Sequence, residues 1–400
     1  MFDRSKIVVG LEIGSSKVCA VVGELTEGGA MCVIGLGAAP TEGGVRKGEI
    51  VNSDLVENAV RIALAQAEND SDIEIGSVYL GVTGSHIKGL NNRGVHQISP
   101  VGGEIDNEDI RQVISVTRPA IAPEQEVLHT VRQHFRVDGQ DDVKNPVGRM
   151  ASRLELDVHI VCGQRTRIQN PIRLVKGLGI EVEDIAFNGR VMALPILTSQ
   201  ICEQGSLVID LGAGTTEYTV YLNGSLSHCG VLAIGGDHVT NDLAVGLKLT
   251  QARAERLKMN HGSAVCDPRR KSHKVNFSSD VGLDDKQVCV GDLHRIMHAR
   301  LDELFLLIRA GLERNKLMRR INGGILLFGG VARTPQIDVL AQKILGLEIL
   351  THYEPEADEA PDFMSCPEYI TAIGLAKHGA RQISSGRRQK RGVFGWLTRK

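Results

Sequence analysis

The chain has 400 residues, of which 42% are hydrophobic and 24% charged, so it has room for two or more domains with their own cores. Its formal net charge of −2 argues against a protein that binds polyanions over its whole surface. Eight cysteines without a C-x-x-C pair predict neither a zinc site nor a disulfide framework. The N-terminus lacks a signal-peptide pattern and no apolar run is long enough to span a membrane, so we expect a cytoplasmic body.

Strand-like runs alternate with helical patterns along most of the chain, which predicts an α/β fold. Strands are expected at 7–13, 18–24, 32–37, 77–82, 156–162, 207–211, 217–222 and 325–328. Helices are expected at 53–68, 166–177, 293–318 and 334–345. Ser53 is the expected N-cap of the first helix, and Thr334 followed by Pro335 is expected to begin the last.

Two stretches about two hundred residues apart have the same pattern. The segment "GLEIGSSKVCAVV" aligns with "VIDLGAGTTEYTV", so that Glu12 matches Asp210 and Gly14 matches Gly212. Each reads as a strand, an acid, a turn of small residues and a second strand. This internal repeat predicts two related half-domains, each with a sheet that ends in such a hairpin.

The residue types in the two turns suit a phosphate chain. Small residues let the backbone approach a ligand and point successive N–H groups into one concavity, which binds anions. Hydroxyls and a lysine add further donors, and the acid before each turn, Glu12 or Asp210, could hold a hydrated Mg²⁺. The turns supply Gly14, Ser15, Ser16, Lys17, Gly212, Ala213, Gly214, Thr215 and Thr216. Two facing hairpins would clamp a triphosphate between two domains, although each alone could be an ordinary hairpin.

Neither turn is a Walker P-loop, since each leads into a strand and the G-x-x-x-x-G-K-[ST] pattern is missing. Three further features could complete a nucleotide site. Gly235 and Gly236 precede a helix whose N-terminus would favour a phosphate. Glu255 and Lys258, at i and i+3, are either ribose contacts or a surface ion pair. The run Gly329, Gly330, Val331 and Ala332 follows a strand and either admits a flat base or makes a packing turn.

The C-terminal end is basic and amphipathic. Residues 387–400 contain six basic residues and no acid. As a helix, this end would place apolar side chains on one side, flanked by basic ones, in the plane of lipid headgroups. The apolar set is Val393, Phe394, Trp396 and Leu397, and the flanking set is Lys390, Arg391, Arg399 and Lys400. A disordered basic tail is the alternative; nucleic-acid binding is not expected, because one aromatic residue makes a poor stacking platform.

Taken in order, these motifs resemble the superfamily of actin, sugar kinases and Hsp70 chaperones. Within it, the chain resembles the FtsA family of bacterial cell-division proteins. The resemblance is carried by "VVGLEIGSSKVCAVVGE", "VYLGVTGSHI", "KNPVG", "LVIDLGAGTTEYTVY", "GGDHVTNDLA", "ILLFGGVARTPQI" and "YITAIGLAKHG", which span nearly all of residues 6–380.

The resemblance implies an actin-like two-lobed fold made of duplicated ribonuclease H-like domains, with an inserted subdomain and a C-terminal amphipathic helix. The implied division is 1–82 with 165–190 for the first lobe, 83–164 for the insertion, 191–229 with 323–380 for the core of the second lobe, 230–322 for an upper subdomain, 381–389 for a linker and 390–400 for the membrane-targeting helix.

The resemblance also implies a function. Such a protein binds ATP and Mg²⁺, forms filaments through contacts that involve the insertion, and tethers the FtsZ ring to the cytoplasmic face of the inner membrane at the division site. The FtsZ C-terminal peptide would dock on 230–322, and later division proteins would be recruited.

The chain departs from the family pattern in three places. Ala213 stands where Gly-Gly-Gly is commoner, "TTEY" stands where Thr-x-Asp is more usual, and Glu12 replaces the aspartate of actins. No catalytic residue can be named, so hydrolysis would be weak at most and the nucleotide would act as a structural switch. A sugar kinase on the same fold would need an aspartate base facing a sugar cleft. A chaperone would need a peptide-binding domain after residue 380, and a rod-type cytoskeletal homologue would lack the tail.

Overall fold

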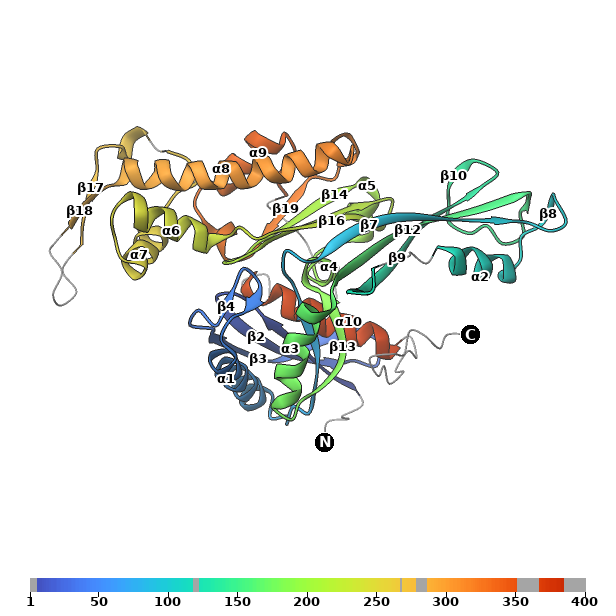
Figure 1. Cartoon of the computed structure of the whole chain (residues 1–400), viewed down its shortest axis with the longest axis horizontal. Coiled ribbons are helices and arrows are strands. Elements are labelled where there is room, and N and C mark those ends of the chain that lie inside the picture. Colours follow the sequence, from blue (N-terminus) through green and yellow to red (C-terminus); the bar gives the residue numbers. More distant parts are fainter. Residues whose placement is uncertain (1–5, 118–121, 267, 278–285, 351–366, 385–400) are drawn as a thin grey trace.

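The computed structural model describes residues 6–117, 122–266, 268–277, 286–350 and 367–384. Two sheets form the centres of two lobes, and the hairpins of the internal repeat lie in them (Figure 1). The first sheet has the order β13 (Glu181–Phe187), β6 (Ser77–Val82), β1 (Ile7–Ile13), β2 (Lys17–Leu25) and β3 (Met31–Pro40). The second has the order β16 (Ser225–Leu232), β15 (Thr216–Leu222), β14 (Ser206–Leu211) and β19 (Ile325–Phe328).

The two sheets share one topology, which confirms the predicted repeat. In each, an antiparallel hairpin occupies the centre, with Ile13 opposite Val18 in the first sheet and Leu211 opposite Thr216 in the second. A third antiparallel strand follows on one side, and a parallel strand from later in the chain lies on the other. Each hairpin therefore presents its turn at the corresponding edge of its own lobe.

The helices cover these sheets and build the upper part of the second lobe. In the first lobe, α1 packs on β2 and β3, and α3 packs beside β13. In the second lobe, the buried residues of α8 and α9 join those of β14 and β15 in one hydrophobic core. The helix bounds are α1 (Ser53–Ser71), α3 (Arg165–Gly177), α4 (Asn188–Val191), α5 (Ser199–Gln204), α6 (Gly236–Gly246), α7 (Gln251–His261), α8 (Val290–Arg314), α9 (Ile337–Leu345) and α10 (Ile370–Ser384).

Residues 83–164 form a separate inserted subdomain, as predicted. Its sheet has the order β10 (Gln140–Val143), β9 (Gln125–Val137), β12 (Arg153–Gln164) and β7 (Lys88–Gln97), and α2 (Asn107–Val116) packs against β7 and β12. The subdomain projects to one end of the molecule, and the hairpin of β17 (Lys274–Phe277) and β18 (Lys286–Cys289) lies at the other (Figure 1).

The last helix, α10, corrects the expected domain division. Residues 323–380 were assigned to the second lobe, but α10 packs on β1, β2 and β6 of the first. Ala372, Ile373 and Leu375 are buried there against Val8 and Val21. Gly10 permits this close packing, because a Cβ at that position would lie 2.1 Å from the Ala372 carbonyl oxygen. The first lobe is thus completed by a segment far along the chain.

Two expected helix starts are also wrong. The α1 helix is capped by Asn52, whose side chain accepts a hydrogen bond from the Leu55 N–H, rather than by Ser53. The α9 helix begins at Ile337 after Gln336, which has a φ of +63°. Thr334 and Pro335 instead follow a short 3₁₀ turn over Gly330–Arg333, and the Thr334 N–H donates to the Val331 carbonyl.

Candidate functional site

A cavity of about 420 Å³ lies between the two lobes, in the size range of small-molecule sites. Both hairpin turns line it, together with parts of α6, α7 and α8, the turn after β19 and the start of α10. The predicted residues that line it are Glu12, Gly14, Ser15, Ser16, Lys17, Asp210, Gly212, Ala213, Gly214, Thr215, Gly236, Glu255, Lys258, Gly329, Gly330 and Val331. The structure therefore gathers residues spread over more than three hundred positions into one cleft.

The two turns are built alike. The Gly14 N–H donates to the Lys17 carbonyl over 2.9 Å, and the Gly212 N–H donates to the Thr215 carbonyl over 3.0 Å. Within the described residues, no hydrogen bond uses the backbone N–H groups at the tips, which are those of Ser15, Ser16, Ala213 and Gly214. These N–H groups are available to an anion, and paired turns of this kind suit a phosphate chain.

Three carboxylates lie beneath the turns. Burial, followed by the charge of neighbouring Asp210, raises the pKa of Glu12 to about 8. Burial also raises the pKa of Asp210 to about 6, although Thr371 hydrogen-bonds to that carboxylate. A positive ion at this place would relieve the unfavourable burial of negative charge.

Glu217 is the third carboxylate, and the sequence analysis did not include it in the site. It lies on β15 with 4% exposure, and burial followed by the charge of Asp210 raises its pKa well above its usual range. Its Oε1 atom accepts hydrogen bonds from Thr83 and Thr215, whereas its buried Oε2 atom has no partner. The sequence signal for Glu217 was the acid in "TTEY", which lies two residues beyond the turn. Its side chain lines the cleft.

These oxygen ligands fit a hydrated Mg²⁺, because that ion prefers carboxylates and keeps several of its waters. The unpartnered Oε2 atom of Glu217 is an acceptor that such an ion's water could use. Over the described part of the chain, no three Asp, Glu, His or Cys side chains converge to hold a metal directly.

The N-terminus of α6 packs behind the second turn. The Gly236 N–H donates to the Gly212 carbonyl over 3.0 Å, and the Asp237 N–H donates to the Ala213 carbonyl over 2.9 Å. The Gly235 N–H donates to the His238 ring over 3.2 Å. This helix start therefore supports the second turn, and Gly236 lines the cavity.

Glu255 and Lys258 lie together on α7, on the wall of the cleft. The Lys258 Nζ atom is 2.7 Å from Glu255 Oε2 and donates to Thr240 Oγ1 over 2.9 Å. Thr240 also donates to Glu255. The pair is thus bound to α6, and the side chain of Lys258 is only 14% exposed, which is unlike a free surface ion pair.

Three predicted residues lie outside the cavity lining, namely Thr216, Gly235 and Ala332. Thr216 is fully buried, and its hydroxyl donates to the Ile234 carbonyl over 2.8 Å, so it supports the sheet. Ala332 lies in the 3₁₀ turn between Val331 and Arg333, both of which line the cavity. Gly329 has a φ of +85°, and a Cβ there would lie 2.3 Å from Asp210 Oδ1, so this glycine makes room for the acid.

The structure adds cleft residues that carried no local signal. Thr371 comes from the start of α10 and Glu368 from the 3₁₀ turn Pro367–Tyr369 before it, and Glu368 pairs with Arg333 over 2.6 Å. The Lys17 ammonium lies 5.5 Å from the centre of the Tyr369 ring. Met259, Met297 and Leu301 give one side of the cavity an apolar wall.

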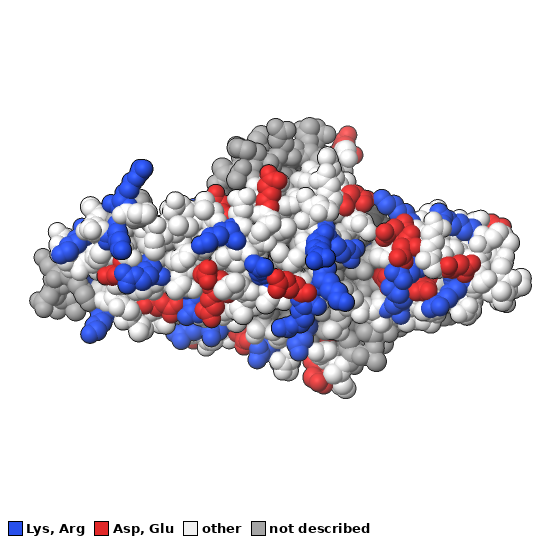
Figure 2. Space-filling model, turned by 90° about the horizontal axis from the view of Figure 1, so that it is seen from above, with Lys and Arg blue, Asp and Glu red and all other residues white. Residues whose placement is uncertain are grey.

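The predicted membrane residues of the tail, at 390–400, lie outside the described residues. Among the described helices, none is both long and apolar enough to cross a membrane. The face seen from above carries acidic and basic side chains interspersed along the molecule (Figure 2). The described residues of that face therefore form no continuous basic stripe.

Comparison with protein families identifies two regions. The model described as "Cell division protein FtsA" matches residues 207–374, and the model "SHS2 domain inserted in FTSA" matches residues 84–162. The second match coincides with the inserted subdomain.

Similar proteins agree with this result. The chain is 32% identical to the cell division protein FtsA of Pseudomonas aeruginosa, over 96% of this chain and 92% of that protein. It is 30% identical to FtsA of Escherichia coli K12, over 99% and 97%.

Solved structures establish the fold. The chain resembles the PilM–PilN type IV pilus biogenesis complex with a TM-score of 0.65 at 16% identity, covering 93% of this chain and 98% of that one. It resembles MreB5 of Spiroplasma citri bound to AMPPNP with a TM-score of 0.58 at 15% identity, covering 96% and 100%. The protein thus has a mixed α/β actin-like fold with an inserted SHS2 domain, and the chain belongs to the FtsA family of cell division proteins.

Proposed function

We propose that the protein binds ATP with Mg²⁺ in the cleft between its lobes. The observation that carries this proposal is the pairing of two hairpin turns with free N–H groups next to three carboxylates whose pKa values are raised. An anion over the turns and a cation over the acids is the charge pattern of a metal-bound triphosphate. The similar MreB5 structure contains AMPPNP, which supports a nucleotide for this cleft.

The residues divide into three roles. The turns at 14–17 and 212–215 would hold the phosphates, and Glu12 and Asp210 would hold the ion through water. Glu255 and Lys258 would contact the ribose, and the backbone of Gly329 and Gly330 would lie against the base. Mg²⁺ would neutralise the phosphate charge. We propose weak hydrolysis at most, so that the nucleotide acts as a structural switch.

We further propose that the protein polymerises and tethers the FtsZ ring to the cytoplasmic face of the inner membrane. Membership of the FtsA family supports this role. The FtsZ C-terminal peptide would dock on the upper subdomain, 230–322, where α8 exposes Leu306 and Leu307. The inserted subdomain, 83–164, would make filament contacts, and later division proteins would be recruited to the filament.

The tail would attach the protein to anionic lipid as a short amphipathic helix after a linker at 381–389. Each basic residue near an anionic surface contributes about 1 kcal/mol, and a single short apolar set binds weakly. A filament that presents many tails would bind by avidity. Membrane attachment would therefore depend on polymerisation and, through it, on the nucleotide.

A reconstitution with vesicles tests this function. Vesicles containing anionic lipid are mixed with FtsZ, Mg²⁺ and ATP, and then sedimented. Full-length protein should carry FtsZ into the pellet, and FtsZ lacking its C-terminal peptide should stay in the supernatant. Deletion of 388–400, which leaves α10 intact, should prevent pelleting of both proteins. Equal pelleting of the truncated protein would rule out the tether, and FtsZ recovery without its peptide would rule out the docking proposal.

A further inference from the structure

The inserted subdomain is joined to the first lobe by two short crossings. The first runs from the end of β6 to the start of β7, over residues 83–87, and the second joins β12 directly to α3 at 164–165. The His86 ring lies between them, since the Gln164 N–H donates to His86 Nδ1 over 3.2 Å. A Cβ on Gly163 would lie 2.8 Å from the same atom. The two crossings therefore meet around one side chain.

The inserted subdomain also contacts the second lobe. Its strands β7 and β9 pack against β16, and the Gln133 side chain donates to the Leu226 carbonyl over 3.2 Å. Lys144 pairs with Glu203 of α5 over 2.7 Å. The subdomain is thus covalently attached to one lobe and packed on the other, so its position must respond when the lobes move relative to each other.

The first crossing begins inside the cleft. Thr83, its first residue, lines the cavity, and its hydroxyl donates a hydrogen bond to Oε1 of Glu217 on the second lobe. The other oxygen of Glu217 is buried without a partner. The Glu217 carboxylate therefore has one oxygen hydrogen-bonded to the crossing and one oxygen available to a ligand in the cleft.

The same crossing touches both hairpin turns through Gly48. A Cβ on Gly48 would lie 3.1 Å from Thr215 Cγ2, 3.2 Å from Gly84 Cα and 3.2 Å from Thr83 Cγ2. The Gly48 N–H donates to Ser15 Oγ over 3.1 Å. Gly48 can occupy this position because its φ of +76° suits glycine. Gly48 therefore connects the start of the crossing to both turns.

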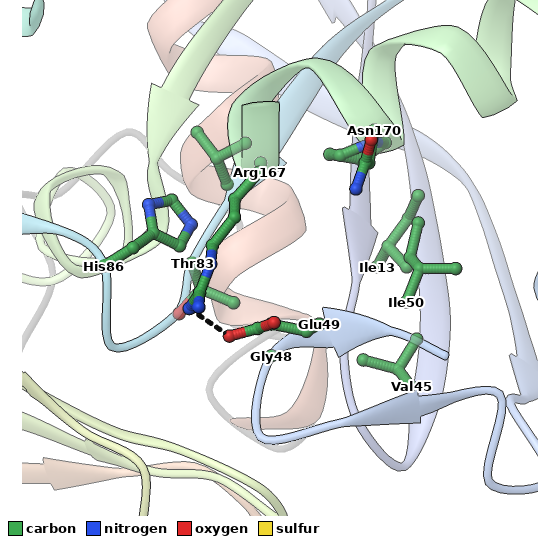
Figure 3. A pocket seen from close by; sticks show the side chains of 12 residues that line it. Ile13, Val45, Gly48, Glu49, Ile50, Thr83, His86, Arg167 and Asn170 are labelled. Carbon is green, nitrogen blue, oxygen red and sulfur yellow. Dashed lines mark hydrogen bonds and ion pairs between the residues drawn. The ribbon is translucent and has the colours of Figure 1, made fainter. Parts of the chain in front are cut away.

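A small cavity of about 50 Å³ lies on the far side of the crossing (Figure 3). Glu49 of the short strand β5 (Glu49–Ile50) and Arg167 of α3 form an ion pair across it, and Thr83 and His86 lie on the same wall (Figure 3). Thr83 lines both cavities, so it separates the cleft from the base of the inserted subdomain.

We propose that Thr83 transmits the occupancy of the cleft to the inserted subdomain, by way of its hydrogen bond to Glu217. A ligand that engages the free oxygen of Glu217 fixes this carboxylate, and the fixed carboxylate holds Thr83 and the crossing behind it. The subdomain then moves less about His86 when the cleft is filled. Thr83 is a positioning residue in this scheme, which rests on the nucleotide binding proposed above.

Hydrogen exchange measured by mass spectrometry on the full-length protein tests the proposal, with AMPPNP and Mg²⁺ as the ligand. The turns at 14–17 and 212–215 should exchange up to about 100-fold more slowly at saturation, which reports binding itself. The crossings at 83–87 and 164–165 should slow by about fivefold or more, the size of an ordinary coupling between sites.

The variants separate coupling from binding. Thr83→Val removes the hydroxyl and keeps the shape, so the turns should stay protected by the ligand while the crossings lose their protection. Thr83→Ser should restore protection of the crossings. Thr130→Val, on an exposed position of β9, is the matched control and should behave as wild type. Where Thr83→Val unfolds, Thr83→Ala provides the same test.

Four results would overturn the inference. Protection of the crossings in Thr83→Val would show that the hydroxyl transmits nothing. Loss of protection at the turns in that variant would make Thr83 a binding residue. Protected turns with unchanged crossings in the wild type would leave the nucleotide site standing and remove the coupling, whereas unprotected turns in the wild type would remove both proposals.

Discussion

Gly214, at the tip of the second hairpin turn, lies directly against Ser15, at the tip of the first. A Cβ at position 214 would come within 2.2 Å of Ser15 Oγ and 2.9 Å of the Lys47 backbone nitrogen. The two lobes are therefore in contact at the turns, and the absence of one side chain sets how closely they approach. The neighbouring Ala213 shows that the turn accepts a Cβ where the other lobe does not face it.

Gly214→Ala should therefore push the two turns apart. Overpacking of this kind costs about 1–3 kcal/mol, and the Lys47 nitrogen cannot move aside as a flexible side chain would. We expect a lower free energy of unfolding in urea and weaker AMPPNP binding by calorimetry. Gly76→Ala is the control, because a Cβ at that exposed position meets nothing within 4 Å. Equal effects of the two substitutions on stability and on AMPPNP binding would show that the contact at Gly214 does not determine how closely the two turns approach.

The raised pKa of Glu12 predicts how stability depends on pH in the absence of nucleotide. The folded value is about 8 and the unfolded value 4.5, so the folded state binds more protons between them. The free energy of unfolding should then fall as pH rises through this window, by at most about 1.4 kcal/mol per pH unit for one carboxyl. Glu12→Gln should reduce the decrease in the free energy of unfolding over this pH window.

Denaturant unfolding between pH 6.5 and 8 measures the effect of Glu12. The window lies above the ordinary pKa of histidine, so buried His159, whose pKa burial lowers to about 3, stays neutral throughout. Glu27→Gln, at an exposed position, is the control and should keep the wild-type slope. Parallel curves for Glu12→Gln and the wild type would contradict the assignment.

Glu255→Ala distinguishes a ribose contact from a surface ion pair. As a ribose contact, its loss should weaken AMPPNP binding by about tenfold or more, since a hydrogen bond to a charged group contributes about 1.5–3 kcal/mol. Asp292 and Arg295 of α8 form a matched i, i+3 pair at 2.8 Å with more exposed side chains. Asp292→Ala should leave AMPPNP binding unchanged. Equal AMPPNP affinities of the two variants would show that Glu255 and Lys258 form only a surface ion pair.

Gly10→Ala should loosen α10 from the first sheet. A Cβ there would lie 2.1 Å from the Ala372 carbonyl oxygen and 2.8 Å from the Ala376 nitrogen, both of which are backbone atoms. We expect a loss of about 1–3 kcal/mol or more in the free energy of unfolding. Gly177→Ala is the control, because a Cβ at that position has open space around it. Equal stability of the two variants would show that the packing of α10 tolerates a shift.

The sequence was informative wherever the signal was local. The two turns were predicted because glycines, hydroxyls and a preceding acid stand together in each, and the repeat between them made the pairing specific. Residues 83–164 also stand out locally, because scattered glycines and the polar stretch "DGQDDVKNPVG" interrupt the strand and helix patterns there. These features depend on neighbouring residues, which is the range over which turn chemistry and periodicity act.

Other features depended on contacts that no local pattern encodes. The packing of α10 on β1 joins positions more than 350 residues apart, and its apolar face would have suited either lobe. The first N–H groups of α6 donate to carbonyls of the second turn, and this contact is visible only when both segments are placed. Glu217 was passed over because its strand position alone does not show that its side chain faces the cleft.

The placement of α10 has a consequence for how the protein is made. The first lobe begins at the N-terminus, yet one face of its sheet stays uncovered until residues 370–384 have left the ribosome. That face, which includes Val8, Cys19 and Val21, is therefore covered by α10 only after residues 370–384 have been synthesised. A nascent chain arrested before residue 370 exposes an apolar sheet surface, which makes it a substrate for chaperones rather than a folded half-molecule.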